Sequence, residues 1–110
     1  MIIPGGNHID RRRTLTPREY LIDPHRFGVD SRTPFHAPYP PGGDPVSAKI
    51  SRLQHELVLA WRATRPSGAG SRDARAFGIS TSTWSRTLLG ERWMGETVMA
   101  AVLRSLDLPR

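Results

Sequence analysis

The chain has 110 residues, with 16 lysines and arginines against 10 acidic residues, so its formal net charge is +6 at pH 7. This length suits one domain with a tail, and the basic balance favours nucleic acid as a partner ahead of an acidic membrane surface. The sequence contains no cysteine, which excludes disulfides and thiolate metal sites. It has no membrane-spanning apolar run and no signal peptide at its start, so we expect a cytoplasmic protein.

Composition divides the chain near residue 45. Residues 1–45 hold eight of the ten prolines and six arginines against five acidic residues, a net charge of +1. Residues 46–110 hold ten basic residues against five acidic ones, a net charge of +5. Because proline and glycine interrupt regular structure, we expect residues 1–45 to be an extended, irregular segment. Residues 46–110 are predicted to be the folded domain.

One local element stands out in the first segment. Thr16 and Glu19 have the spacing of a capping box, with Pro17 at the first helical position. We therefore expect a short helix near residues 17–22. Four aromatic residues follow this start, and they either pack back on the helical domain or dock on a partner: Tyr20, Phe27, Phe35 and Tyr39.

The second segment has the apolar spacing of helices. We expect a first helix over residues 47–64 and a second over 71–77, with a third over 81–89 and a fourth starting near residue 95. The apolar stripe expected on the first helix consists of Val46, Ile50, Leu53, Leu57 and Trp61. The aromatic residues expected in the core are Trp61, Phe77, Trp84 and Trp93. The predicted fold class is all-α, a compact four-helix domain.

The stretch from residue 71 to residue 90 has the pattern of a helix-turn-helix. Ala74 is small enough to let the two helices approach closely. Gly78 can adopt the left-handed conformation that ends a helix, and Ser80 suits the N-cap of the next helix. Trp84 can hold the angle between the helices from inside. The second helix of such a motif enters the major groove of DNA.

The run ARAFGISTSTWSRTLLGER resembles the XRE-like DNA-binding domains, the family of phage repressors and Cro-type regulators. The likeness extends over roughly residues 46–108 and implies a helix-turn-helix fold and DNA binding. The chain departs from the family pattern at four positions. Asp73 and Thr87 stand where the family prefers apolar residues, and Leu88 and Leu89 stand where it usually has polar ones.

The residues expected to contact bases are Thr81, Ser82 and Arg86. If Trp84 and Leu88 face inward, the opposite side of the helix presents these three side chains, and the resemblance implies the same role. The hydroxyl groups can donate or accept, and the guanidinium can form two hydrogen bonds to guanine. The alternative for the serine and threonine is that they simply favour the start of a helix.

Other residues are candidates for phosphate contacts, because basic side chains and helix N-termini attract anions. The candidates are Ser71, Arg72, Ser80, Thr83 and Arg92. The alternative for them is a solvated surface charge or a helix cap. A basic cluster formed by Arg11, Arg12 and Arg13 would act as a minor-groove arm, although such a triplet is more often a solvated patch.

These observations favour a sequence-specific double-stranded DNA-binding protein, a repressor-like transcriptional regulator of phage or mobile-element type. A single recognition helix reads few bases, so a homodimer is expected, through the last helix, the C-terminal end or the N-terminal segment. The alternative is a protein-interaction module, an antitoxin or polymerase-binding factor, that binds a protein partner through residues 1–45. The four histidines lack metal spacing, and we expect no cofactor and no enzymatic activity.

Overall fold

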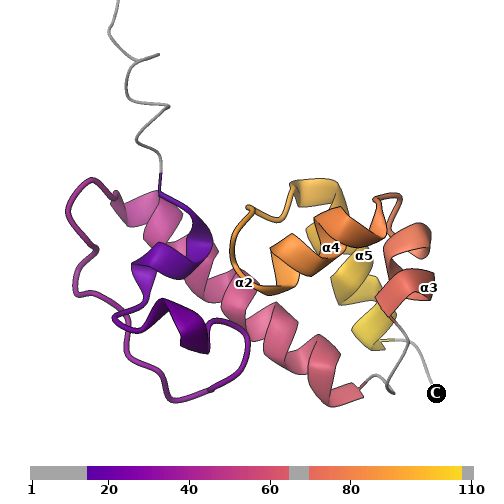
Figure 1. Ribbon diagram of the computed structural model, residues 1–110, viewed down its shortest axis with the longest axis horizontal. Coiled ribbons are helices and arrows are strands. Elements are labelled where there is room, and N and C mark those ends of the chain that lie inside the picture. Colours follow the sequence, from indigo (N-terminus) through magenta and orange to yellow (C-terminus); the bar gives the residue numbers. More distant parts are fainter. Residues whose placement is uncertain (1–14, 65–69, 108–110) are drawn as a thin grey trace, which may run out of the picture.

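The computed structural model describes residues 15–64 and 70–107 (Figure 1). Its α-helices in these ranges are α2 (Pro45–Thr64), α3 (Gly70–Ala76), α4 (Thr81–Leu88) and α5 (Glu96–Asp107). Two short 3-10 helices precede them, η1 (Pro17–Tyr20) and η2 (Pro24–Arg26). The all-α class is confirmed, because within the described residues the only β pairing is an isolated bridge between Leu21 and Phe35. None of the described helices is long and apolar enough to cross a bilayer.

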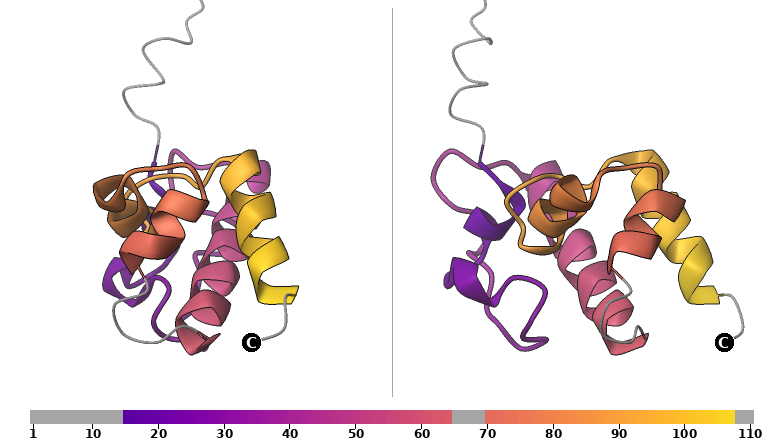
Figure 2. Two further views of the ribbon diagram at one scale, coloured as in Figure 1. Left: turned by 90° about the vertical axis from the view of Figure 1, so that its right-hand side faces the viewer. Right: turned by 45° about the vertical axis from the view of Figure 1, so that its right-hand side comes forward.

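Helix α2 is the central element. The N-terminal segment contacts its first half, α5 runs beside its second half, and α3 packs against α4 (Figures 1 and 2). Two features set the start of α2. The Asp44 carboxylate accepts hydrogen bonds from the Ser47 N–H and hydroxyl, both at 2.8 Å, and these bonds lower the pKa of Asp44. Pro45 occupies the first helical position, which needs no N–H donor. The helix therefore begins two residues before the predicted start at residue 47.

Residues 15–44 share one core with the helices that follow. Leu21 and Phe27, 0% and 2% exposed, belong to the same buried cluster as Trp61 and Trp84. The change of composition at residue 45 thus coincides with the start of α2, and it marks no break in the core. Of the four N-terminal aromatic residues, Tyr20 and Phe27 are buried, Phe35 is half-buried and Tyr39 is 38% exposed.

The predicted capping box is present at the start of η1. The Thr16 N–H and hydroxyl both donate to Glu19 Oε1, at 2.6 Å and 3.0 Å. The helix is of the 3-10 type and ends at Tyr20, short of the expected residue 22. A second anchor lies beside it, where the Ser51 hydroxyl of α2 donates to the Pro17 carbonyl at 2.7 Å.

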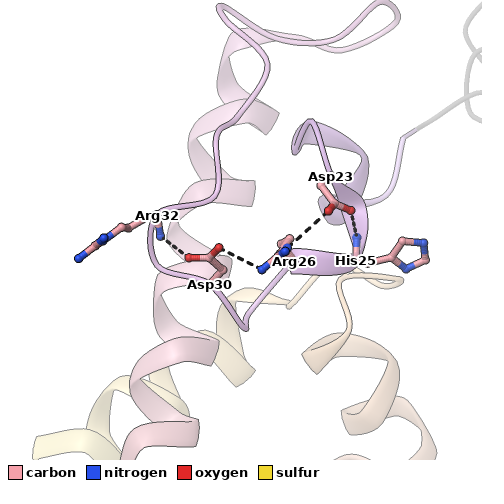
Figure 3. A network of polar contacts seen from close by, with 5 residues as sticks. All are labelled: Asp23, His25, Arg26, Asp30 and Arg32. Atoms are coloured by element: carbon pink, nitrogen blue, oxygen red, sulfur yellow. Dashed lines mark hydrogen bonds and ion pairs between the residues drawn. The ribbon is translucent and has the colours of Figure 1, made fainter.

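The loop over residues 23–32 balances its own charges (Figure 3). Arg26 lies 3.5 Å from Asp23 and 3.4 Å from Asp30. Backbone N–H groups complete the network, since His25 donates to the Asp23 carboxylate and Arg32 donates to the Asp30 carboxylate. Exposed pairs of this kind stabilise a fold by only about 0–1 kcal/mol each. Their effect here is to leave little net charge on this loop.

Helix α2 presents a different face to the core than its apolar spacing predicts. Val46, Ile50 and Leu53 are 65%, 37% and 42% exposed. The buried residues of the helix are Ser51, Gln54, His55, Leu57, Val58 and Trp61. The first half of the expected stripe therefore faces outward. The reason is that polar side chains of α2 find buried hydrogen-bond partners in the N-terminal segment and in the loop before α5, so they take the inner face.

Gln54 shows how these partners hold the helix. Its side chain is fully buried, and its Nε2 group donates to the carbonyls of Thr87 and Arg92, at 2.9 Å and 3.0 Å. Its Oε1 atom accepts from the Met94 N–H at 2.8 Å. The amide thereby satisfies three backbone groups at the end of α4 and in the loop that leads to α5.

His55 joins α2 to the N-terminal segment. Its Nδ1 atom accepts from the Gly28 N–H at 2.8 Å, and its ring meets the edges or faces of Phe27 and Phe35 at centroid distances of 5.5 Å and 5.4 Å. The backbone at Gly28 lies close against α2: a Cβ added to Gly28 would lie 2.5 Å from a methyl carbon of Val58. Burial lowers the pKa of His55 below its ordinary value of 6.5.

Candidate nucleic-acid interface

The turn between α3 and α4 is built on glycine. Gly78 has φ = +80°, and its N–H donates to the Arg75 carbonyl at 3.1 Å. The next N–H, that of Ile79, reaches back to the Ala74 carbonyl at 3.0 Å. These two bonds form a Schellman motif, which satisfies the last carbonyls of α3 and turns the chain toward α4. Gly78 thus has the conformation that the sequence predicts.

Aromatic packing fixes the arrangement of the two helices from inside. Trp84 of α4 is 1% exposed and meets Phe77 edge-on at 5.0 Å between ring centroids. Its other neighbour is Trp61 of α2, at 5.3 Å. Ala74 is fully buried, as a small residue must be at a close helix contact. Of the four expected core aromatics only Trp93 is half-buried, and its Nε1 donates to the carbonyl of residue 15 at 2.9 Å.

Ser80 caps the N-terminus of α4. Its Oγ accepts from the Thr83 N–H at 3.1 Å and donates to the Thr83 hydroxyl at 2.9 Å. The Ser82 hydroxyl lies 3.3 Å from the Ser80 hydroxyl, so three hydroxyl groups gather at the start of the helix. The capping role expected for Ser80 is therefore present. A phosphate at this end would have to share Ser80 and Thr83 with the cap.

The outward side of α4 is polar and exposed. Thr81, Ser82 and Arg86, the three predicted base-contacting residues, all lie on the exposed surface. Sequence reasoning omitted two exposed neighbours, Ser85 and Leu89, the latter 48% exposed. The missed signal was the helical period, because positions 82, 85, 86 and 89 follow one another at spacings of three, one and three. The exposed side is thus wider than the three predicted residues.

The departures from the XRE-like pattern have structural partners. Asp73, where an apolar residue is usual, accepts a hydrogen bond from Trp61 Nε1 at 2.7 Å. Thr87 is only 2% exposed, and its hydroxyl donates to the Thr83 carbonyl at 2.8 Å. A buried hydroxyl costs little when it is hydrogen-bonded in this way. Leu88 is half-buried, as its expected inward position requires.

The C-terminal end of α4 is held by the N-terminal segment. Gly90 has φ = +76°, and the Glu91 N–H donates to the Arg86 carbonyl at 2.9 Å, which makes a second Schellman motif. The Gly90 carbonyl accepts from the Arg18 N–H at 2.9 Å, and a Cβ added to Gly90 would lie 2.6 Å from the Phe27 ring. An ion pair of 3.3 Å joins Arg18 to Glu91 and offsets the acid nearest to α4 in sequence.

The remaining phosphate candidates are spread over three elements. Arg72 is exposed in α3, and Ser71 precedes it in the same helix. Thr83 and Arg92 line the same hollow of about 250 Å³ between α4 and the start of α5. The predicted arm at residues 11–13 lies outside the described residues. The structure therefore brings two of the predicted contacts, Thr83 and Arg92, together beside α4.

Comparison with known proteins gives this chain no family. No protein-family model matches the sequence, and neither the curated proteins nor the solved structures contain a match.

Proposed function

We propose that this chain binds double-stranded DNA in a sequence-specific manner and reads the major groove with α4. The observation that carries the proposal is the two-sided character of this helix. Trp84 is buried on one side, while Thr81, Ser82 and Arg86 are exposed on the other. A Schellman turn at Gly78 joins α3 to α4, and in this proposal the two helices act as a helix-turn-helix. The resemblance to XRE-like domains further leads us to expect that the protein acts as a repressor-like regulator.

The charge around α4 favours contact with a polyanion. The helix itself has one arginine and no acidic residue over residues 81–88. Arg86 and Arg92 form no ion pair with any carboxylate in the described part of the chain, so both guanidinium groups are available. In this proposal Arg86 contacts a guanine edge, and the hydroxyls of Thr81 and Ser82 contact neighbouring bases. Arg72 and Arg92 contact phosphates and set the orientation.

The test is selection of bound duplexes from a random pool, followed by titration of the selected duplex. We expect Arg86→Ala to weaken binding to that duplex by about 1–3 kcal/mol while leaving non-specific binding nearly unchanged. Arg72→Ala and Arg92→Ala should weaken all sequences alike, and each should reduce the salt slope by about one. Arg104→Ala, an exposed arginine on α5, is the matched control. A pool that yields no preferred sequence contradicts the proposal, and so does an Arg86→Ala variant that behaves like the control.

The interaction-module alternative is supported by one observation. A hollow of about 210 Å³ lies between residues 35–45 and α2, and Tyr39, Lys49 and Arg52 help to line it. Phe27 is buried away from this hollow, whereas Tyr20, although only 3% exposed, is among the residues that line it. If this alternative holds, Tyr39→Ala abolishes capture of a protein partner while Arg86→Ala has no effect. Under the DNA-binding proposal the two variants behave in the opposite way toward duplex.

A further inference from the structure

Helix α2 carries an apolar stripe that the described residues leave uncovered. Val46, Ile50 and Leu53 follow one another at spacings of four and three, so they lie on one side of the helix. They are 65%, 37% and 42% exposed. Leu57, the next residue in the series, is only 5% exposed. The stripe therefore begins at the N-terminal end of α2 and stops where the helix becomes buried.

Two opposite charges flank this stripe on the same edge. Lys49 and Glu56 are seven residues apart, so they lie two helical turns apart on nearly the same line. Both side chains are exposed, and neither forms an ion pair with another described residue. The midpoint of this charge pair lies near residues 52 and 53. The midpoint between Ile50 and Leu53 lies near residues 51 and 52, almost level with it.

These positions have a consequence for a two-fold arrangement. When a helix packs against an antiparallel copy of itself, each residue faces one at about the same distance on the other side of the symmetry axis. With the axis near the middle of the stripe, Ile50 faces Leu53 of the partner subunit. Lys49 then approaches Glu56 of the partner subunit, and the same pair forms a second time by symmetry. The stripe and its charges are thus complementary to themselves.

We propose that this stripe is the contact surface for a second copy of this chain, with the two α2 helices packed antiparallel. The charge pattern favours a second copy of the chain as the partner. Lys49 and Glu56 lie at about equal distances from the middle of the stripe, so each meets the opposite charge when the same surface is turned through 180°. A parallel two-fold pairing would place the charged edges of the two helices on opposite sides of the contact, so neither Lys49 would meet a glutamate of the partner subunit. The stripe has only three large apolar residues, so the dimer is weak and depends on concentration.

This dimer goes beyond DNA binding and does not depend on it. It differs from the dimer contacts expected from the sequence, which were the last helix, the C-terminal end and the N-terminal segment. Its test therefore uses the full chain without DNA. Failure of the dimer leaves the duplex-binding experiment unaffected, and failure of duplex binding leaves the dimer unaffected.

The experiment is sedimentation velocity over a concentration series, with circular dichroism to show that each variant keeps its helices. We expect the natural chain to shift from monomer toward dimer as concentration rises. Lys49→Glu and Glu56→Lys should each weaken the dimer about tenfold or more, because each reversal turns two attractions into two repulsions. The double variant K49E/E56K restores both pairs and should recover most of the association. Leu53→Ser should also reduce it.

Arg62→Glu is the matched control, since it makes the same charge change at an exposed position on α2 outside the stripe. It should leave the dissociation constant nearly unchanged. A chain that stays monomeric at every concentration overturns the proposal. A double variant that is no better than the single ones overturns the antiparallel pairing.

Discussion

At the scale of single residues, buried polar side chains decide how α2 meets the rest of the molecule. Gln54 and His55 are 0% and 2% exposed, and both bond to backbone groups far away in the sequence. An unpartnered buried backbone group costs about 1–3 kcal/mol. If the apolar stripe faced inward, Ile50 and Leu53 would be more deeply buried, but several buried backbone groups would lose their hydrogen-bond partners. The hydrogen bonds outweigh the gain from that extra apolar burial.

Gln54→Leu tests this balance. The variant keeps a similar volume but removes the partners of two carbonyls and one N–H. We expect the free energy of unfolding to fall by about 3 kcal/mol or more in urea denaturation. Arg62→Ala, an exposed change on the same helix, should stay within about 0.5 kcal/mol of the natural chain. Equal effects of the two changes would show that the amide network contributes little.

His55 makes stability depend on pH. Its Nδ1 accepts from Gly28, so the neutral ring carries its proton on Nε2, and a second proton would set two N–H groups against each other. Burial lowers the pKa of His55 in the folded chain below 6.5, with Arg52 acting in the same direction and the charges of Asp30 and Glu56 against it. The unfolded chain then binds more protons as pH falls below 6.5, so the free energy of unfolding decreases there.

We expect this loss when unfolding is followed by tryptophan fluorescence between about pH 8 and pH 5. His55→Asn removes the titrating group and keeps an acceptor near Nδ1. This variant should be less stable at neutral pH, but its stability should vary less over the same interval. A variant whose profile has the same slope as that of the natural chain would assign the pH dependence to other groups.

At the scale of elements, α3 and α4 end in the same motif but in different surroundings. Gly78 and Gly90 have φ values of +80° and +76°. No atom of the described residues lies within 4 Å of a Cβ added to Gly78, whereas one added to Gly90 would meet Phe27 at 2.6 Å and Arg18 at 2.8 Å. The first glycine is needed for its backbone conformation alone. The second is also needed for space, because the N-terminal segment packs directly on the turn.

This difference predicts unequal effects of alanine. Gly78→Ala should lower the free energy of unfolding by about 1–2 kcal/mol, the cost of a left-handed conformation with a side chain. Gly90→Ala should cost about 1–3 kcal/mol more, because Phe27 must also move. Urea denaturation of both variants measures the difference. Equal losses would mean that the contact between Phe27 and the end of α4 gives way easily.

Much of the structure of the individual elements could be predicted from the sequence. The two short helices with a turn between them, the glycine at residue 78, the Ser80 cap and the buried Trp84 follow from local chemistry, which acts over a few neighbouring residues. The inward face of α2 could not be predicted, because the partners of Gln54 lie 33 to 40 residues away in the chain. The packing of Phe27 depends likewise on the end of α4, which no local pattern near Phe27 reveals.

At the scale of the whole molecule, the N-terminal segment is part of the core. Tyr20, Leu21 and Phe27 are at most 3% exposed. Burial of such side chains contributes about 1.5–3 kcal/mol each, and a chain of roughly 65 residues has little stability to spare. The helices over residues 45–107 therefore depend on a segment whose composition alone predicts a tail.

Deletion of residues 1–44 should consequently abolish cooperative unfolding. Circular dichroism over a thermal ramp would show a broad, non-cooperative transition or loss of helical signal at low temperature. Deletion of residues 1–14 is the control, because it keeps the contacts described above for residues 15–44, and it should keep a sharp transition. Were the chain from residue 45 onward to melt sharply by itself, the N-terminal segment would be an accessory to an independent core.

The contacts of Arg18 and Phe27 with Gly90 also matter for transferring α4 to another protein. Transplanting only residues 71–90 into a foreign scaffold would carry over the bend and its aromatic clamp. It would omit the contacts of Arg18 and Phe27 that position the C-terminal end of α4. A chimera that keeps the orientation of α4 must also include residues 15–28 and the part of α2 against which they pack.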